Sequence, residues 1–245
     1  MVEDLLIVAA GMGTRLRARG NLKPLVEVAG KPLVEYALEA AFGAGIKRAT
    51  VVTGYSANVL EPRLEALSEQ KGWPIQIVYN ADYKRSNGLS VLAARDHLEG
   101  KRFCLAMCDH IVEPLLYRRL LGQTYLAGEV ALAVDTRLNN PFVDLGDVTK
   151  VRMSGPFIRD IGKEISIYTA FDTGVFCADD ALMEAITQAG RQHGDFSISG
   201  GMKMLAAEGR ALGVDVQDAF WVDVDSPDMH RLATDWVMMN QRATA

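Results

Sequence analysis

The sequence Leu5-Leu6-Ile7-Val8-Ala9-Ala10-Gly11-Met12-Gly13-Thr14-Arg15-Leu16, followed by Lys23-Pro24-Leu25, governs how the rest of this chain is interpreted. An apolar run of strand length leads directly into a loop that carries two glycines, a hydroxyl and a guanidinium. Glycines let backbone N–H groups approach phosphate oxygens closely, and Arg15 and Lys23 supply the positive charge that a desolvated phosphate chain needs. The stretch therefore predicts a loop that holds a polyphosphate.

The loop differs from the two best-known phosphate motifs. Leu16 stands where the dinucleotide fingerprint requires a third glycine, and no Gly-Lys-Ser/Thr follows Gly11 as a P-loop would require. A tight turn after a buried strand would by itself explain Gly11 and Gly13. Their combination with Arg15 and Lys23 favours phosphate binding.

Length and composition set the class of protein. The 245 residues, 49% of them hydrophobic, are enough for one α/β domain with a sizeable core, and we expect a single domain over 1–245. The 26 basic and 31 acidic residues give a formal net charge of -5, and no basic run is longer than two residues. Sequence-independent binding to nucleic acid is therefore not expected.

The cysteines and the apolar segments bear on location. Three cysteines are an odd number, which favours a reducing compartment, and Cys104 and Cys108 lie on an expected strand as buried thiols. The start is acidic and its apolar run is short, so no signal peptide is predicted, and no stretch approaches the ~18 apolar residues of a membrane span. We expect a cytoplasmic protein without a membrane segment.

Strand and helix patterns alternate along the first half of the chain, which indicates a parallel sheet with right-handed crossovers. Expected strands cover residues 5–10, 49–54, 74–80 and 103–108, and expected helices cover 31–42, 58–70 and 87–98. After residue 129 the strands become short and alternating, at 129–135, 148–151, 157–163 and 168–176, followed by helices at 179–192, 201–208 and 226–240 and strands at 213–216 and 220–225.

The predicted fold is thus α/β, with a Rossmann-like mixed, mainly parallel sheet flanked by helices and a small antiparallel lobe. We expect two halves, over about 1–128 and about 129–245.

Several polar residues occupy positions where ligands bind in such folds. Asp109 follows the strand 103–108, and ligands of open α/β sheets bind at the carboxyl ends of strands, so Asp109 is either a metal ligand or a cap. Asp223 and Asp225 lie on one face of a strand, which is costly without a cation or donors. Lys163 follows a strand and is either a substrate ligand or a solvated surface group. His110 is expected to be a local hydrogen-bonding neighbour.

Taken together, these motifs resemble the nucleotidyltransferase family that activates phosphorylated sugars and alcohols with an NTP. Within it, the chain is most similar to the branch that transfers cytidylyl groups to inositol 1-phosphate or phosphocholine-like acceptors. The residues that carry the resemblance are Ala9 to Leu16 with Lys23-Pro24, Ser86-Asn87-Gly88-Leu89-Ser90, Asp109-His110, Asp147 to Val151, Ile161-Gly162-Lys163, Asp172-Thr173-Gly174 and Trp221 to Pro227.

The resemblance implies a GT-A-like fold and assigns roles. It assigns nucleotide binding to the half over about 1–128 and acceptor binding to the half over about 129–245. It implies Mg²⁺ held by Asp109 and Asp225, with Asp223 as the second choice, and phosphates neutralised by Arg15 and Lys23. It also implies that Lys163 holds the acceptor phosphate and that Asp172 and Thr173 contact the hydroxyls of a polyol. The implied nucleotide-binding set is Ala9, Ala10, Gly11, Met12, Gly13, Thr14, Arg15, Lys23, Asn80, Asn87, Gly88 and Asp109. The implied substrates are CTP and a phosphorylated alcohol, and a separate membrane CDP-alcohol phosphotransferase would act downstream.

Other functions remain open from the sequence. Tyr168, Phe171 and Trp221 could form an aromatic cage for choline. A hexose-1-phosphate enzyme using UTP, dTTP or GTP would share the first loop and the acids. A nucleotide-binding regulator is disfavoured because the basic and acidic residues of the centre are all present. A nicotinamide dehydrogenase is disfavoured by Leu16.

Overall fold

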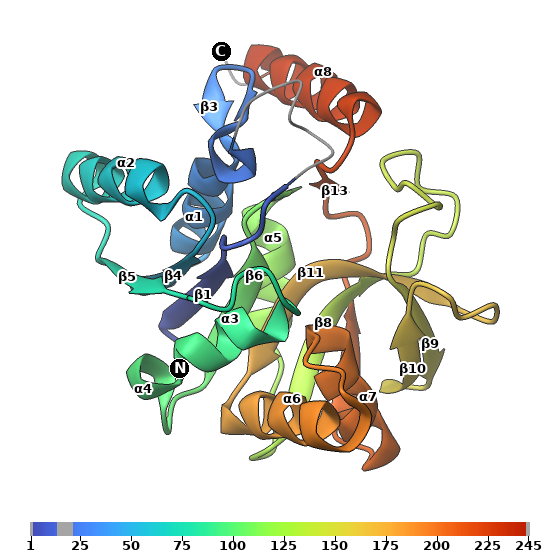
Figure 1. The fold of residues 1–245 in the computed structure, drawn as a ribbon. Coiled ribbons are helices and arrows are strands. Elements are labelled where there is room, and N and C mark those ends of the chain that lie inside the picture. The colour runs from blue at the N-terminus through green and yellow to red at the C-terminus, as the bar shows by residue number, and fades with distance from the viewer. Residues whose placement is uncertain (1, 14–21, 244–245) are drawn as a thin grey trace.

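One nine-stranded sheet runs through the protein (Figure 1). The structure is a computed structural model that describes residues 2–13 and 22–243. The strand order is β5-β4-β1-β6-β11-β8-β12-β10-β9. The strands are β1 (Asp4–Val8), β4 (Arg48–Thr53), β5 (Ile75–Tyr79), β6 (Phe103–Met107), β8 (Val130–Asp135), β9 (Lys150–Ser154), β10 (Phe157–Gly162), β11 (Ala170–Ala178) and β12 (Ala211–Asp215).

The sheet is mixed, as the sequence predicted. β5, β4, β1 and β6 are parallel, whereas β11 pairs antiparallel with both β6 and β8. The antiparallel segments are not a separate layer, because β11 lies inside the same sheet and eight of its nine residues are buried. A strand buried on both faces reads as a nearly continuous apolar run, which explains the sequence of β11. The division into halves at about residue 128 stays a prediction.

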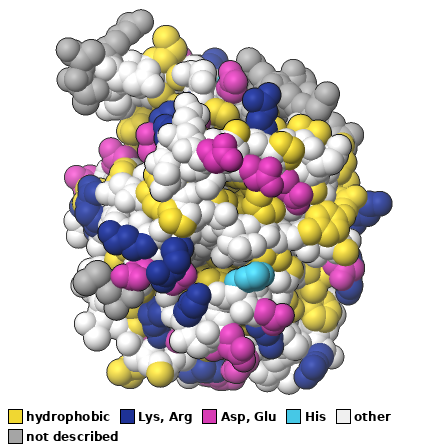
Figure 2. Space-filling view, turned by 90° about the vertical axis from the view of Figure 1, so that its left-hand side faces the viewer, with side chains coloured by type: hydrophobic (Ala, Val, Ile, Leu, Met, Phe, Trp, Pro, Cys, Tyr) yellow, Lys and Arg dark blue, Asp and Glu magenta, His cyan; other side chains and the backbone are white. Residues whose placement is uncertain are grey.

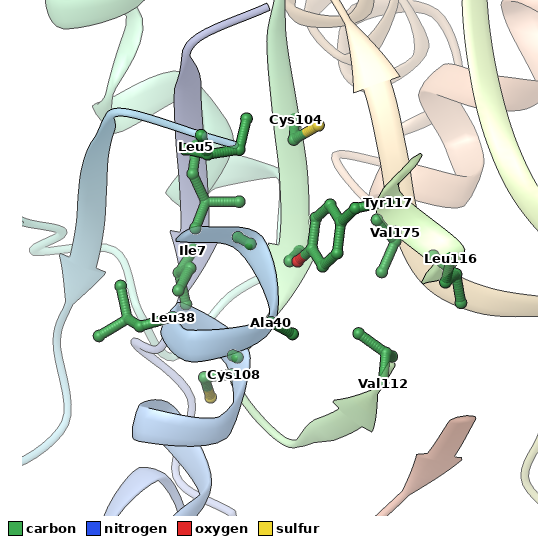
Figure 3. Close-up of a cluster of buried hydrophobic side chains, with 14 of the residues drawn as sticks. Leu5, Ile7, Leu38, Ala40, Cys104, Cys108, Val112, Leu116, Tyr117 and Val175 are labelled. Atoms are coloured by element: carbon green, nitrogen blue, oxygen red, sulfur yellow. The ribbon is translucent and has the colours of Figure 1, made fainter. Parts of the chain in front are cut away.

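Helices cover both faces of the sheet. Alternate residues of β1 point to opposite faces, so each set packs into a different core. Leu5 and Ile7 belong to a core with α1 (Leu33–Gly43), α2 (Ala57–Lys71) and α5 (Pro114–Leu121), and Figure 3 shows Leu38 and Tyr117 beside them. Leu6 and Val8 belong to a second core on the other face. That core includes residues of α3 (Gly88–Ala93), α4 (Arg95–Leu98), α6 (Asp180–His193) and α7 (Ile198–Ala207).

A third, smaller core holds together the part of the molecule that carries the site. It packs α8 (Pro227–Ala243) against two short two-stranded sheets. One pairs β2 (Glu27–Val28) with β3 (Lys31–Pro32), and the other pairs β7 (His110–Val112) with β13 (Trp221–Asp223). The β7–β13 pairing brings the segment after β6 next to the segment before α8, although these segments are far apart in the sequence.

Some elements differ from the sequence prediction. The helix expected over 87–98 is two short helices, α3 and α4, separated at Ala94. The segment 110–121 was not predicted, but it forms β7 and α5, with Pro114 in the first turn of the helix. A strand of three residues is too short to show a period of two, so its sequence carries no clear signal.

The surface and the helices bear on interactions with larger partners. Figure 2 shows that Lys and Arg side chains share one face of the molecule with Asp and Glu side chains. Within residues 2–13 and 22–243, every helix is either too short or too polar to cross a bilayer.

Candidate active site

Three carboxylates meet at the carboxyl end of β6. Asp109 lies two residues after the end of β6, and the backbone N–H of Val224 donates to its carbonyl oxygen at 3.0 Å. In the β7–β13 pair, Asp223 lies opposite His110. These backbone contacts set Asp223 and Asp225 beside Asp109, as the sequence predicted for a site at this edge.

Lys23 lies at the centre of these acids. It begins the short 3-10 helix η2 (Lys23–Leu25), is only 7% exposed, and places Nζ 2.5 Å from Asp109 Oδ2. Nζ also contacts Asp225 Oδ1 and lies 3.9 Å from Asp223 Oδ1. Burial lowers the pKa of Lys23, but the charges of Asp109 and Asp223 outweigh burial, so the pKa is raised. Lys23 therefore stays protonated and neutralises part of the acidic centre.

Asp109 is held in its ionised form. Burial raises its pKa, but the charges of Lys23 and His110 outweigh burial and the pKa is lowered overall. Lys23 and Asp109 thus form a buried ion pair. Removal of Lys23 would leave Asp109 and Asp223 with only His110 as a counter-charge among the described residues, which is unfavourable in a buried site.

His110 bridges two of the acids. Its Nδ1 lies 3.4 Å from Asp109 Oδ1, and its Nε2 lies 3.6 Å from Asp223 Oδ2. Burial lowers the pKa of His110, but the charges of Asp223 and Asp109 raise it to about 9, so the imidazole is charged at neutral pH. Gly174 gives the ring its space, because a Cβ at this position would lie 2.6 Å from Nδ1 and φ is +75°.

The carboxylates fit a hard divalent cation. One oxygen of Asp109 and one of Asp223 are buried with no hydrogen-bond partner among the described residues. Asp147, Asp223 and Asp225 each offer an oxygen within 4.8 Å of the others. Buried oxygens that lack donors are costly, and carboxylate oxygens are the ligands that Mg²⁺ prefers. The residues present could therefore hold such an ion.

A cavity of about 330 Å³ joins the glycine turn to the acids. Gly11, Gly13, Lys23, Asp109 and Asp225 all line it. A Cβ at Gly13 would lie 2.4 Å from Lys23 Cβ, and its φ is +53°, so only glycine fits here. The predicted phosphate loop and the predicted metal ligands thus face one cavity.

A second cavity, of about 260 Å³, lies on the other side of the acids and shares Asp109 and Asp225 with the first. Lys163 lines it and places Nζ 2.6 Å from Asp147 Oδ1. Asp172 also lines it, accepts from the backbone N–H of Gly174 at 2.7 Å, and has its pKa raised by burial to about 6. Lys163 and Asp172 therefore share one compartment, as expected for acceptor binding.

Two predicted ligands have structural contacts instead. Thr173 is fully buried, and its hydroxyl donates to the carbonyl of Ala133 at 2.8 Å, because it points to the opposite face of β11 from Asp172. Asn80 is 5% exposed, donates to Ser90 Oγ at 3.0 Å and accepts from the N–H of Asp82 at 2.9 Å. Neither side chain lines the two cavities.

The backbone groups of Ala9 and Ala10, which belong to the implied nucleotide-binding set, are partly engaged in hydrogen bonds within the protein. The N–H of Ala9 donates to Val52, and the carbonyl of Ala10 accepts from Tyr55. Gly88 is buried, and a Cβ there would lie 2.3 Å from a backbone oxygen just before α7. Its small size is explained by packing between helices.

Four predicted nucleotide-binding residues remain, of which the structure describes two, Asn87 and Met12. Asn87 lines both cavities while its Oδ1 accepts from the N–H of Ile198 at 3.0 Å. Met12 is 37% exposed. Thr14 and Arg15 lie outside the described residues.

Sequence reasoning missed a buried carboxylate behind the second cavity. Asp135, at the end of β8, is fully buried and accepts from Trp221 Nε1 at 2.7 Å. It also accepts from Arg137 and from Asn140, at 2.8 Å each. This network fixes the start of the loop 136–149, which lines the second cavity. The available signal was an aspartate that ends an apolar strand and is followed by donors two and five residues later.

The sequence and the fold can be compared with those of known proteins. A family model described as the MobA-like NTP transferase domain matches residues 5–198. The chain belongs to this family. The matched region of this NTP transferase contains the glycine turn, Lys23, Asp109 and Asp172.

Relatives with a described activity cover nearly the whole of this NTP transferase. The bifunctional IPC transferase and DIPP synthase of Rubrobacter xylanophilus is 35% identical over 242 residues, 95% of this chain and 51% of that protein. The one from Thermococcus kodakarensis is 30% identical over 92% of this chain and 48% of its own length. The chain thus spans about half the length of these curated relatives.

Solved structures show the same fold. The inositol-1-phosphate CTP transferase from T. maritima superposes with a TM-score of 0.82 at 22% identity and covers 95% of both chains. A UDP-glucose pyrophosphorylase bound to UDP-glucose superposes with a TM-score of 0.78 at 18% identity, covering 98% of this chain and all of that one. The nucleotidyltransferase fold predicted from the sequence is confirmed.

Proposed function

We propose that this NTP transferase moves a cytidylyl group from CTP to 1L-myo-inositol 1-phosphate, releasing pyrophosphate and forming CDP-inositol. The observation that carries the proposal is the junction of two cavities at Asp109 and Asp225. One cavity contains the glycine turn and the other contains Lys163 and Asp172. Relatives named IPC transferases align over more than nine-tenths of the chain, which supports the same acceptor here.

The reaction is an in-line displacement for which the protein supplies position and charge. A phosphate oxygen of the acceptor forms a bond to the α-phosphorus of CTP while the bond to the pyrophosphate oxygen breaks. Lys23, beside the glycine turn, would neutralise the phosphate chain. Asp109 and Asp225 would hold Mg²⁺, with Asp223 beside them, and the bound ion would offset the charge of the reacting phosphates. Arg15 remains a proposed second cation for the same phosphates.

The second cavity suits a phosphorylated polyol. Lys163 would exchange its partner Asp147 for the acceptor phosphate, which carries more charge. Asp172 uses Oδ1 for Gly174, and Oδ2 has no donor among the described residues, so it would accept from a hydroxyl of the polyol. Thr173 is not included among the acceptor ligands, because its hydroxyl donates to the Ala133 carbonyl inside the sheet.

A choline-type acceptor finds less support. Of the three aromatic residues considered for a cage, only Trp221 lines the second cavity. Phe171 is fully buried in the core. Tyr168 packs against it with its ring tilted by 38°, and the ammonium of Lys150 lies over the Tyr168 ring. These side chains do not surround a common space, so a quaternary ammonium would not be enclosed by them.

The proposed reaction also indicates a cellular location for the protein and a class of enzyme that would use its product. CTP and the free, buried thiols of all three cysteines suit a cytoplasmic location. CDP-inositol is an activated polyol, and a CDP-alcohol phosphotransferase in the membrane would consume it.

A turnover screen tests the function. Purified protein with Mg²⁺ would be offered CTP, UTP, GTP or dTTP together with inositol 1-phosphate, phosphocholine or glucose 1-phosphate, and pyrophosphate release would be followed. We expect the highest kcat/KM for CTP with inositol 1-phosphate, and a strongly reduced rate of release from an Asp109→Asn control. A higher value for UTP, dTTP or GTP with glucose 1-phosphate would assign the chain to the hexose branch. Absence of release with every pair would indicate a nucleotide-binding regulator.

A further inference from the structure

The ammonium of Lys23 occupies the space in which the carboxylates would hold a cation. Its Nζ lies 2.5 Å from Asp109 and contacts Asp225, the two residues proposed to bind the metal, and lies 3.9 Å from Asp223. The side chain is 92% buried, so little solvent screens these charges. Without ligands, the protein therefore supplies its own counter-ion to the acidic centre.

A divalent cation at Asp109 and Asp225 would share these oxygens with the ammonium. Carboxylate oxygens bind Mg²⁺ at about 2 Å, so the two positive charges would lie within a few ångströms of each other. Like charges at such a distance in a buried site repel strongly. Either the ion binds weakly or the ammonium moves to another anion.

A nucleotide triphosphate provides that other anion. Lys23 lines the same cavity as the glycine turn, and its backbone is fixed by η2 and by the bond from the Val26 N–H to its carbonyl. Rotation about side-chain bonds alone would turn the ammonium from the acids to phosphates held at Gly11 and Gly13. Movement in that direction vacates the acidic centre as it neutralises the nucleotide.

We propose that Lys23 couples the two ligands: the triphosphate withdraws the ammonium from Asp109 and Asp225, so that metal and nucleotide each strengthen the binding of the other. Coupling between two ligands is reciprocal, so either ligand reports it. The inference rests on the proposed function, because it requires that an NTP binds at the glycine turn. It goes beyond charge neutralisation, because Lys23 is predicted to oppose binding of the metal alone.

The test measures metal binding without turnover. Mn²⁺ is titrated into the free protein and the unbound ion is followed by electron paramagnetic resonance. Lys23→Met should bind Mn²⁺ alone at least about tenfold more tightly than the wild type, because the competing ammonium is gone. Lys150→Met is the matched control: it removes the same charge, but Lys150 donates to the Lys163 carbonyl and not to the acids, so its affinity should stay within about twofold.

The same titration with α,β-methylene-CTP measures the coupling. The analogue should raise Mn²⁺ affinity by a larger factor in the wild type than in Lys23→Met. An unchanged or weaker affinity of Lys23→Met for Mn²⁺ alone would overturn the inference, as would equal coupling in both proteins. Pyrophosphate release by the wild type is scored separately, so this failure would leave the proposed function standing.

A second measurement uses the wild type alone, so it tests the inference even if Lys23→Met does not fold. The ¹⁵Nζ resonance of Lys23 is followed in the wild type as Mg²⁺ is added without nucleotide. Movement toward the position of a solvated lysine supports displacement of the ammonium. A fixed resonance while the carboxyl resonances of Asp109 and Asp225 report bound Mg²⁺ would overturn it.

Discussion

Replacement of Asp135 by alanine should destabilise the protein and weaken acceptor binding. Asp135 is fully buried and accepts hydrogen bonds from Trp221, Arg137 and Asn140. Trp221 is 1% exposed, so the loss of its acceptor leaves an orphaned N–H, which costs about 1–3 kcal/mol. Arg137 is 36% exposed and can return to water, so its lost bonds and that of Asn140 add about 0.5–1 kcal/mol each. The sum is about 3 kcal/mol.

The assay is denaturant unfolding at neutral pH, supported by a thermal scan. For a protein of this size, about 3 kcal/mol corresponds to roughly 6–12 °C in Tm. Asp218→Ala is the matched control, because Asp218 also pairs with an arginine, Arg119, but is 82% exposed. It should destabilise the protein much less than Asp135→Ala, because solvent screens an exposed ion pair. Equal losses for the two variants would refute the claim that burial decides the strength of the Asp135 network.

The same variant has a functional readout, because Asp135 fixes the start of the loop 136–149 beside the second cavity. We expect the KM for inositol 1-phosphate to rise by a larger factor than the KM for CTP. A larger rise for CTP would show that the loop does not serve the acceptor.

Four further outcomes are expected. Asp109→Asn should lower kcat by about 10²–10³ with the fold intact by circular dichroism, since charge stabilisation of a phosphoryl transition state contributes several kcal/mol; a loss below about tenfold would contradict the assigned role. Lys163→Met should raise the KM of the acceptor more than that of CTP in initial-rate kinetics, because Lys163 faces the second cavity beside Asp147. Burial raises the pKa of Asp172 from 3.8 to about 6, so stability is lost as the pH rises from about 4 to about 6 and the loss is complete above that range; Asp172→Asn should gain about 1–2 kcal/mol in denaturant unfolding at pH 7.5 and no advantage below about pH 4. Tyr117→Phe should leave the free energy of unfolding unchanged or raise it by up to about 1 kcal/mol, because the Tyr117 hydroxyl is buried with no partner among the described residues; a loss above about 1 kcal/mol would show a hidden hydrogen bond.

The sequence predicted those parts of the site that follow regular elements. β1 and the glycine turn after it, Asp109 after β6, and the acids near β13 are marked by apolar runs that end in polar residues. In a parallel sheet the carboxyl ends of strands share one edge, so the approach of the glycine turn to Asp109 could be inferred without coordinates. Asp223 and Asp225 reach that edge through the separate β7–β13 pair, and only the family resemblance implied their position. Lys163 and Asp172, which the family resemblance assigned to acceptor binding, both line the second cavity, and their roles stay predictions.

The errors arose where a choice depends on register or on short local contacts. Thr173 and Asp172 are neighbours on β11, and only the pairing with β8 decides which one faces the cavity. Asn80 lies in a polar segment where several residues could form the turn that its side chain makes with Asp82. The partners of Asp135 include Trp221, which is distant in the sequence, so no local pattern reveals that contact.

A crystal structure with Mn²⁺ and α,β-methylene-CTP bound would test the central claim most directly. The anomalous signal should place one ion within about 2.5 Å of carboxylate oxygens of both Asp109 and Asp225, with the triphosphate at Gly11 to Gly13 and Lys23 on its phosphates. An ion bound away from either carboxylate, or a triphosphate outside the cavity of the glycine turn, would contradict the account.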